Sequence, residues 1–300
     1  MQVTKIAHFK GHQGSVYALQ KLNEIEFLSG SGDHHLVLWN INKEKEGTLL
    51  ATLPSGIYSL LLLNETNLIV GTGNGEIHLI DMLSKKQVLV VKLHQQTVFN
   101  LSFVESKSYI LTSGGDGLLN ILNASGLELL KSFHVGNFKV RFSLINKEET
   151  LAYIGCGDGS VVVLDLNTLS VIHKFAAHGE GFSVNTLAFS VDENLLYSAS
   201  RDARINVFDI KNNYHLLESI PAHNYAIYGM MYSPSKKILA TISRDKTAKL
   251  WPEEEWKVSA RLDKEKLDGH THSVNTMTWM NDNIFLTAGD DRSIIAWQIS

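Results

Sequence analysis

One pattern occurs seven times along the chain, and this repetition limits the possible folds more than any other feature. The stretch SGSGDHHLVLWNI at residues 29–41 joins a glycine-rich turn to alternating apolar residues. Copies read GTGNGEIHLID, SGGDGLLNILN, GCGDGSVVVLD, SASRDARINVFD, TISRDKTAKLWP and TAGDDRSIIAWQ. The turn residues are Asp33, Asn74, Asp116, Asp158, Asp202, Asp245 and Asp291, at intervals of 41, 42, 42, 44, 43 and 46 residues. A nearly constant period of this length indicates an array of equivalent structural units.

Each copy reads as four short β-strands. In the fifth copy, the segments VNTLAFS, LLYSAS, RINVFDI and HLLESI are separated by turns. Their apolar residues alternate with polar ones, which is typical of strands, and no segment shows a convincing helical period. A sheet of four short strands cannot bury both faces alone, so neighbouring copies must stack. The sequence therefore predicts an all-β, seven-bladed β-propeller with four-stranded antiparallel blades.

The copies resemble WD repeats over the whole length of the chain. Gly-His pairs stand at Gly11-His12 and Gly269-His270, with relaxed forms at Ala177-His178 and Ala222-His223. The closing dipeptide is relaxed to Trp39-Asn40, Phe208-Asp209, Trp251-Pro252 and Trp297-Gln298. We identify the chain as a member of the WD-repeat β-propeller family, with one domain over residues 1–300. Its repeats cover approximately residues 3–41, 48–81, 88–123, 128–165, 171–209, 215–251 and 258–299.

The two ends of the chain are expected to complete one blade. In this family the outermost strand of a blade comes from the start of the next sequence repeat. The last copy stops at Ser300 after its third strand, while VTKIAHF at residues 3–9 has no partner of its own. Their pairing would close the ring and cover a sheet edge. The long, charged segment PEEEWKVSARLDKEKLDG before His270 is expected to form a solvated loop and an outer strand, with Trp256 packed at the rim.

Composition restricts the class of protein. With 44% hydrophobic and 19% charged residues, the chain can bury a large core. Its 27 basic and 31 acidic residues leave a net charge of -4, so no general attraction to nucleic acid or an anionic membrane is expected. No signal segment or membrane-spanning run is evident. The single cysteine, Cys156, is expected in the core and fits a reducing compartment, so we expect a cytoplasmic protein.

A His, a Ser, an Asp and a Trp in the first copy could suggest a hydrolase site, but the same set recurs in other copies. A catalytic nucleophile and its base form a single set at one cleft. Because this set of residues recurs in several copies, a structural role is favoured. The resemblance implies that the turn Asp accepts from the His, which bonds a Ser or Thr, which bonds the Trp indole. Such buried groups are tolerated when fully matched. The network residues are His12, Ser29, Asp33, Trp39, His94, Thr112, Asp116, His178, Ser198, Asp202, His223, Thr241, Asp245, Trp251, His270, Thr287, Asp291 and Trp297.

Some copies depart from this pattern. The second has Leu53, Val70, Asn74 and Ile80 at the network positions, a concerted exchange that avoids stranding single polar groups. In the third copy Leu122 replaces the aromatic residue. In the fourth, His134 and Asp158 are expected to face Ile154 and Leu164. The networks of the third and fourth copies must therefore be shorter or include water.

Function is expected on one face of the propeller. The resemblance places contacts at the loops that enter each innermost strand and at the turns between the second and third strands. Around the ring, an aromatic arc is expected from Tyr228, Tyr17, Tyr58 and Phe99, and a basic arc from Lys139, Arg141, Arg201 and Arg244. Aromatic residues and Arg are common at binding hot spots. We expect a protein or peptide with acidic and apolar side chains to bind there. The candidate contact residues are Tyr17, Tyr58, Phe99, Lys139, Arg141, Asn185, Arg201, Tyr228, Arg244, Asn275 and Asp290.

The alternative function is a small-ligand-binding or enzymatic propeller that uses the mouth of the central channel. It would need acids or histidines outside the networks, and Asp290 is the one carboxylate among the contact positions. His34-His35 and His270-x-His272 suggest a metal, but His270 belongs to a network and no acidic or Cys cluster completes a site. No cofactor and no nucleic-acid partner is expected. The sequence thus predicts a non-catalytic interaction scaffold.

Overall fold

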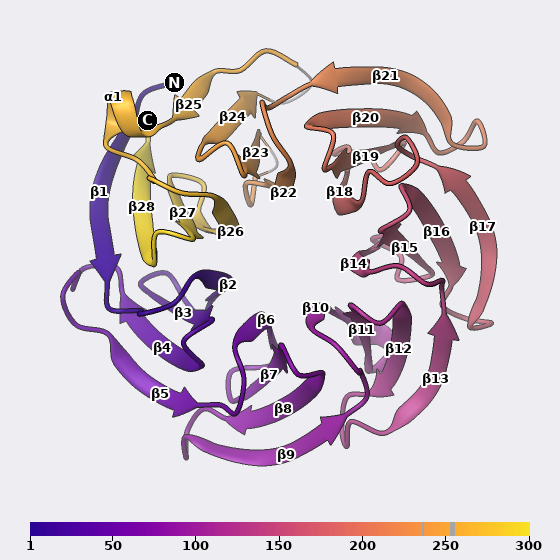
Figure 1. Ribbon diagram of the computed structural model, residues 1–300, viewed down its shortest axis with the longest axis horizontal. Coiled ribbons are helices and arrows are strands. Elements are labelled where there is room, and N and C mark those ends of the chain that lie inside the picture. The colour runs from indigo at the N-terminus through magenta and orange to yellow at the C-terminus, as the bar shows by residue number, and fades with distance from the viewer. Residues whose placement is uncertain (236, 253–255) are drawn as a thin grey trace. The chain divides into compact units, whose positions relative to one another are not determined.

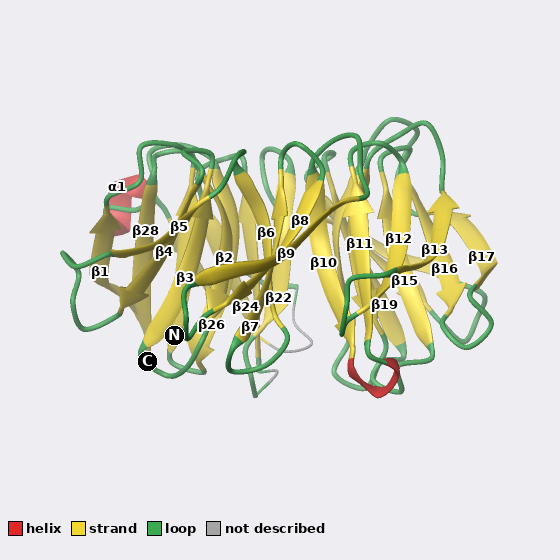
Figure 2. Cartoon of the chain, turned by 90° about the horizontal axis from the view of Figure 1, so that it is seen from below, coloured by secondary structure: helices red, strands yellow, loops and turns green. Residues whose placement is uncertain are grey.

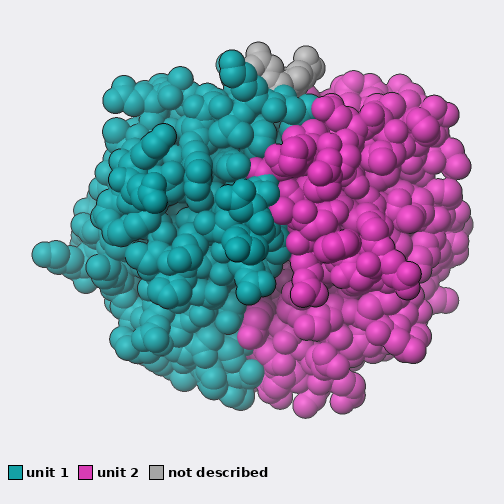
Figure 3. All heavy atoms as spheres, turned by 45° about the horizontal axis from the view of Figure 1, so that its top comes forward, with its two compact units in different colours: residues 1–57, 223–300 teal, residues 58–222 magenta. Residues whose placement is uncertain are grey.

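The computed structural model describes residues 1–235, 237–252 and 256–300. The strands form seven four-stranded sheets, so the prediction of seven four-stranded antiparallel blades is confirmed. The chain divides into two compact units, residues 1–57 with 223–300 and residues 58–222, which Figure 3 draws in different colours. The prediction of a single domain concerns how these units combine, and it stays a prediction.

The first unit contains three blades, numbered here by sequence copy. Blade 1 consists of β2 (Val16–Lys21), β3 (Glu26–Ser31), β4 (His35–Asn40) and β5 (Thr48–Thr52). Blade 6 consists of β22 (Ile227–Tyr232), β23 (Ile238–Ser243), β24 (Ala248–Pro252) and β25 (Ala260–Leu262). Blade 7 consists of β26 (Val274–Asn281), β27 (Ile284–Gly289), β28 (Ser293–Ile299) and β1 (Val3–Lys10).

The second unit contains four blades. Blade 2 has β6 (Ile57–Leu62), β7 (Asn67–Thr72), β8 (Glu76–Asp81) and β9 (Lys86–Lys92). Blade 3 has β10 (Val98–Val104), β11 (Tyr109–Gly114), β12 (Leu118–Asn123) and β13 (Leu129–His134). Blade 4 has β14 (Val140–Ile145), β15 (Leu151–Cys156), β16 (Ser160–Asp165) and β17 (Ser170–Ala176). Blade 5 has β18 (Val184–Phe189), β19 (Leu195–Ser200), β20 (Arg204–Asp209) and β21 (His215–Pro221).

The two ends of the chain pair in blade 7. Strand β1 runs antiparallel to β28, from Val3 opposite Ile299 to Lys10 opposite Ser293. The ladder continues through Gln2, whose N–H donates to the Ser300 carbonyl at 2.8 Å. In Figure 1 the indigo β1 lies beside the yellow β28. The predicted closure of the last blade by the N-terminal strand is therefore confirmed, and it pairs an edge that would otherwise be open.

Apolar side chains from neighbouring blades meet in shared clusters. In the second unit, Tyr153 and Val161 of blade 4 pack with Leu187 and Phe208 of blade 5. Clusters of the same kind join blades 2 and 3 and blades 3 and 4. In the first unit, the cluster between blades 6 and 7 includes Val3 of β1. Within each unit, the narrow sheets thus bury faces against one another, which is the main source of their stability.

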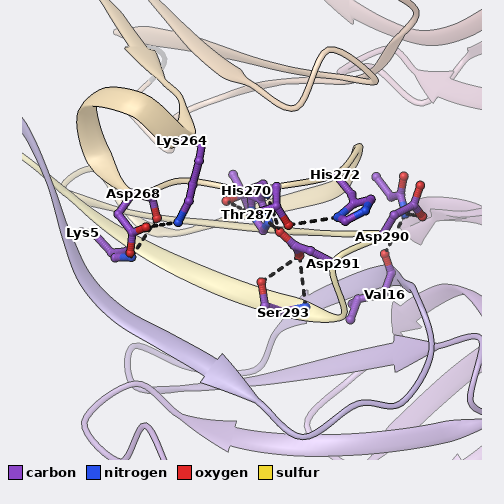
Figure 4. Close-up of polar contacts among 12 residues, drawn as sticks. Lys5, Val16, Lys264, Asp268, His270, His272, Thr287, Asp290, Asp291 and Ser293 are labelled. Carbon is purple, nitrogen blue, oxygen red and sulfur yellow. Dashed lines mark hydrogen bonds and ion pairs between the residues drawn. The ribbon is translucent and has the colours of Figure 1, made fainter.

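The described part of the long segment before His270, residues 256–269, contains a strand and one helical turn; residues 253–255 of the expected loop lie outside the described residues. Strand β25 pairs with β24 over three residues, and α1 (Lys264–Leu267) follows it. The carboxylate of Asp268 contacts Lys264 and also Lys5 of β1 (Figure 4). Trp256 is half-buried, with its ring edge-to-face against Trp251. The outer strand was predicted and the helical turn was not, because one turn is too short to create a period.

Helices are rare in the described chain. Besides α1 there is one three-residue 3₁₀ turn, η1 (Glu105–Lys107), drawn in red at one end of the strands in Figure 2. Within the residues described, neither segment approaches the length that a bilayer crossing requires.

Candidate interaction surface

Blades 1, 6 and 7 contain complete polar networks. In blade 1, His12 donates through Nδ1–H to Asp33 Oδ2 at 2.9 Å and accepts at Nε2 from Ser29 Oγ at 2.7 Å. The indole Nε1–H of Trp39 donates to the same Oγ at 2.7 Å. The carboxylate can only accept, so it sets the tautomer of the imidazole. The corresponding side chains bond in the same order in the other two blades: His223, Asp245, Thr241 and Trp251; His270, Asp291, Thr287 and Trp297. Figure 4 includes His270, Thr287 and Asp291.

Burial and hydrogen bonding shift the pKa values of several groups in these networks. Burial alone would raise the pKa of Asp33, but backbone N–H groups of His35 and Gln13 and the bond from His12 lower it to about 2. Burial lowers the pKa of His12 and of His223, against the opposing effect of their aspartates. Each group is fully engaged with its neighbours, and the same arrangement recurs in several blades. This is a structural arrangement of turn and strands rather than a catalytic one.

Thermal stability is expected to fall when the pH drops from about 7 to about 5. Unfolded histidines bind a proton near pH 6.5, whereas the folded pKa of His12 and His223 is lower. The unfolded state therefore binds more protons in this range, and the free energy of unfolding decreases. Asp33 adds a second loss between its ordinary pKa of 3.8 and its folded value of about 2. Melting temperatures across this pH range measure the effect. The variant His12→Gln should show a smaller loss of stability between about pH 7 and pH 5, whereas His34→Gln, at an exposed side chain, should not. A melting temperature that stays constant over this range would contradict the role given to the buried histidines.

Blades 3 and 5 complete their networks with an asparagine. In blade 3, where Leu122 replaces the Trp, Asn120 Nδ2 donates to Leu93 O at 3.2 Å and lies 3.2 Å from His94 Nε2. In blade 5, Asn206 Nδ2 donates to Ala177 O at 2.6 Å. Both asparagines stand two residues before the closing aromatic position. The remaining bonds join His94 to Asp116 and Thr112, and His178 to Asp202 and Ser198. The sequence analysis overlooked these asparagines, whose signal is their presence in copies that lack Trp.

The assignment of His134 to the network of blade 4 is wrong. His134 is exposed at the end of β13, opposite Leu118. In blade 5 the residue opposite Arg204 is Pro221, and the network histidine of the next blade comes two residues later. The same count from His134 reaches Gly136, so this blade has no network histidine. Lys174 of β17 takes its place, with Nζ 3.1 Å from Asp158 Oδ2.

The position of Leu53 also needs correction. Thr52 lies opposite His35, and counting two residues from Thr52 reaches Pro54. The network histidine of this copy is therefore replaced by Pro54, and Leu53 is the residue before it. Leu53 is buried, and its N–H donates to the His34 carbonyl at 2.9 Å. The one-residue shift arose because the spacing from Leu53 to Asn74 equals the spacing from His12 to Asp33.

A β-bulge stands near the start of the innermost strand in six blades. The register shifts after the first apolar residue of the strand, for example between Val98 and Asn100 in β10. A bulge turns its extra residue away from the regular alternation of the strand. The extra residues coincide with candidate contact residues: Tyr17, Phe99, Arg141, Asn185, Tyr228 and Asn275.

One main-chain bond brings the contact positions of each of these blades together. The residue before the turn Asp donates its N–H to the carbonyl of the residue before the first apolar one. In blade 4, Gly157 donates to Lys139 at 2.8 Å, and in blade 5 Arg201 donates to Ser183 at 3.1 Å. Blade 6 joins Arg244 to Ala226 in the same way. Each blade thus presents its candidate residues as one local group.

In the second unit, candidate residues of blades 2, 3 and 4 lie against one another. Phe99 meets the ring of Tyr58 edge-to-face, with centroids 6.3 Å apart. On the side of blade 4, Arg141 Cζ lies 4.4 Å and Lys139 Nζ 5.9 Å from the centroid of Phe99. We name Tyr58, Phe99, Lys139 and Arg141 the aromatic–basic cluster. Arg201 and Asn185 belong to the neighbouring group of blade 5.

In the first unit the candidate residues are more polar. Asn275 Nδ2 donates to Asp290 Oδ1 at 2.7 Å and to the carbonyl of Val16 in blade 1 at 3.3 Å, in the region drawn in Figure 4. Tyr17 is half-buried, while Tyr228 and Arg244 are exposed. The predicted aromatic and basic arcs each include residues of both units, so their continuity stays a prediction.

Two other kinds of site would be a metal centre and a reactive thiol. Among the residues that the structure describes, no group of three or more His, Cys, Asp or Glu side chains gathers as a metal site would require. Cys156 is buried, and burial raises the pKa of its thiol to about 12. Such a thiol is not a nucleophile at neutral pH.

Seven four-stranded blades, five of which contain a His–Asp network, define a repeat propeller. Comparison with known proteins agrees. The family model for the WD domain, G-beta repeat, matches residues 3–40, 169–209, 214–252 and 263–298, more than half of the chain. This protein therefore belongs to the WD40 family. The WD40 β-propeller domain of Doa1 superimposes with a TM-score of 0.86 at 18% identity, covering 100% of this chain and 97% of that one, so the fold is a β-propeller.

Curated relatives are larger and match only part of the chain. Protein HIR1 of Candida albicans is 25% identical over 165 residues, which is 51% of this chain and 17% of the relative. Elongator complex protein 2 of Arabidopsis thaliana is 32% identical over 93 residues, 29% of this chain and 11% of the relative. WD repeat-containing protein 37 of Mus musculus is 23% identical over 214 residues, 70% of this chain and 42% of the relative. The chain thus spans less than half the length of each of these relatives.

Proposed function

We propose that this protein is a non-catalytic interaction scaffold, and that the loop face of blades 3 to 5 binds a protein segment with acidic and apolar side chains. One observation carries the proposal. Lys139 is exposed and lies beside the ring of Phe99, and Arg201 is exposed in the adjoining blade 5. Within residues 1–235, 237–252 and 256–300, no carboxylate lies within 4.0 Å of the charged group of either residue. Uncompensated positive charge next to aromatic surface is complementary to such a segment.

The chemistry of the remaining residues supports a scaffold rather than an enzyme. In each of five blades one His and the turn Asp are engaged in a turn-and-strand network, and in blade 4 Lys174 bonds to Asp158. Propellers of this family generally act as scaffolds, and Elongator complex protein 2 is by its name part of a complex. We also propose a cytoplasmic location, which the buried thiol of Cys156 fits.

The test reverses two exposed charges. Lys139→Glu with Arg201→Glu should abolish capture of specific partners from native lysate, because both changes place a negative charge where an acidic segment would bind. The fold should persist, since both side chains are exposed. Bound proteins are identified by quantitative mass spectrometry, and melting temperatures check the fold.

The matched control is Lys86→Glu with Lys92→Glu, which makes the same charge change at two exposed positions of the outer strand β9. Partners should be retained by this variant. If the first variant retains the same partners as the unchanged protein, the face of blades 3 to 5 is not the binding surface.

A further inference from the structure

Exposed aromatic side chains occur at two blades. Among the residues that the structure describes, the exposed Phe, Tyr and Trp side chains are Phe182, Tyr225 and Tyr228, at 44%, 61% and 36%. All three stand in the loops that enter the innermost strands of blades 5 and 6 or at the start of the strand itself. Large aromatic groups are mostly buried in folded proteins, so exposure at one kind of position points to a binding role.

The loop of blade 6 is held by bonds from the turn between β23 and β24. Ser243 Oγ donates to the carbonyl of Tyr225 at 3.0 Å, and the N–H of Arg244 donates to the carbonyl of Ala226 at 2.9 Å. Tyr228 is the extra residue of the bulge in β22. The backbone that carries both tyrosines is therefore ordered in the free protein, and a partner need not order it.

Arg244 brings a positive charge to the same group. It is exposed, and within the described part of the chain no carboxylate lies within 4.0 Å of its guanidinium. The neighbouring Asp245 accepts from His223 and Thr247, and its side chain is only 4% exposed. A guanidinium can donate two parallel N–H bonds to a carboxylate. Tyrosine provides an apolar ring with a polar tip beside this donor.

Blade 5 repeats this construction. Ser200 Oγ donates to the carbonyl of Phe182 at 3.0 Å, and the exposed Arg201 donates its N–H to the carbonyl of the residue that follows Phe182, at 3.1 Å. The turns of both blades read Ser-Arg-Asp. In blade 1, Gly14 and Gly32 stand at the positions of the aromatic residue and the arginine. The fold therefore does not require this pair, which indicates a role in contact.

We propose that Tyr225, Tyr228 and Arg244 form a second contact site, which binds a protein segment whose carboxylate side chains stand beside apolar ones. Arg244 bonds to a carboxylate, and the two tyrosine rings contact the apolar side chains. Lys246, also exposed, adds positive charge. One arginine and one lysine without a basic run favour an acidic protein segment over a nucleic acid. The site lies in blade 6, outside the face of blades 3 to 5, so either proposal can fail without the other.

Defined peptides test the site. Short Gly-Ser peptides carry a central Leu-Glu-Glu-Leu, Leu-Gln-Gln-Leu or Ala-Glu-Glu-Ala, and an oligouridine represents the nucleic-acid alternative. Dissociation constants are read by NMR titration from the backbone N–H signals of residues 224–228, which report on this loop. The first peptide should bind at least about threefold more tightly than the second, the size expected of one exposed ion pair, and likewise more tightly than the third, which lacks the apolar side chains.

Variants assign each preference to a side chain. Arg244→Gln should remove the preference for Glu over Gln, and Tyr225→Ala the preference for Leu over Ala, whereas Tyr225→Phe should keep the latter because the ring remains. Arg261→Gln makes the same chemical change on the outer strand β25 of blade 6 and should alter neither preference. Melting temperatures check that each variant is folded.

Several results would overturn the site. These are no binding of the first peptide at millimolar concentration, equal binding of the Glu and Gln peptides, tighter binding of oligouridine, or unchanged preferences in folded Arg244→Gln and Tyr225→Ala. If lysate partners still depend on Lys139 and Arg201 in that case, the scaffold proposal stands without this site.

Discussion

A protein that lacks residues 1–9 is expected to aggregate or to lose most of its stability. The deletion removes nearly all of β1, whose residues pair with β28 from Val3 to Lys10. It also removes the side chain of Phe9, which is 1% exposed and packs with Phe27 and Trp39 of blade 1. Loss of one buried Phe costs about 3–5 kcal/mol. The free energy of unfolding of a domain is only about 5–15 kcal/mol in total. Loss of a core side chain together with a whole ladder of hydrogen bonds therefore removes most of it.

Soluble yield and thermal melting measure this effect, and point variants in the same strand calibrate it. Phe9→Ala should account for about 3–5 kcal/mol of the loss. Ile6→Ala, at a side chain that is 45% exposed, should change stability by no more than about 0.5 kcal/mol. A soluble truncated protein with unchanged melting would show that pairing of β1 with β28 contributes little to the fold.

Replacement of Leu53 by Ala is expected to lower the free energy of unfolding by about 2–5 kcal/mol. The side chain is 6% exposed, so its truncation leaves a cavity in well-packed surroundings. Leu49→Ala in β5 is the matched control, because it makes the same chemical change at a side chain that is 53% exposed. That variant should stay within about 0.5 kcal/mol of the original. Urea unfolding at constant m-value gives both numbers.

A network residue provides the comparison for this value. His270→Ala removes the bonds to Asp291 and Thr287 but leaves both partners and Trp297 in place. We expect a cost of about 1–3 kcal/mol, mainly from the stranded polar groups. If neither Leu53→Ala nor His270→Ala changes the free energy of unfolding, these two buried side chains do not stabilise the fold.

The polar networks show which residue roles a repeated sequence pattern can predict and which it cannot. Four side chains of blade 1 recur at matching intervals in blades 6 and 7, so their common role could be assigned before any coordinates were known. Where a copy is incomplete, interval counting is less secure. It assigned His134 to blade 4 and Leu53 to a histidine position, and strand register corrected both. The intervals between successive turn residues range from 41 to 46 residues, whereas hydrogen-bonded strand register fixes which residues lie opposite each other.

For the candidate surface, too, the sequence predicted the residue types and the structure decided which residues lie together. Residue types at the contact positions came from the repeat alignment. Their grouping depends on the bulges of the innermost strands and on the main-chain bond from the residue before each turn Asp. Neither feature has a sequence signature in a single chain. The contact of Phe99 with Arg141 joins different blades, so the spacing within one copy could not reveal it.

The sequence by itself determined the number of blades and the strands in each, because local alternation, turn chemistry and period recur along the chain. The resemblance to WD repeats implied the pairing of the two chain ends and the order of bonds in the complete networks. Tertiary structure alone decided that Asn120, Asn206 and Lys174 replace missing network groups, and that two cations share the ring of Phe99. Such contacts arise between strands and blades distant in the chain, where side-chain reach and backbone register, rather than sequence spacing, determine which groups meet.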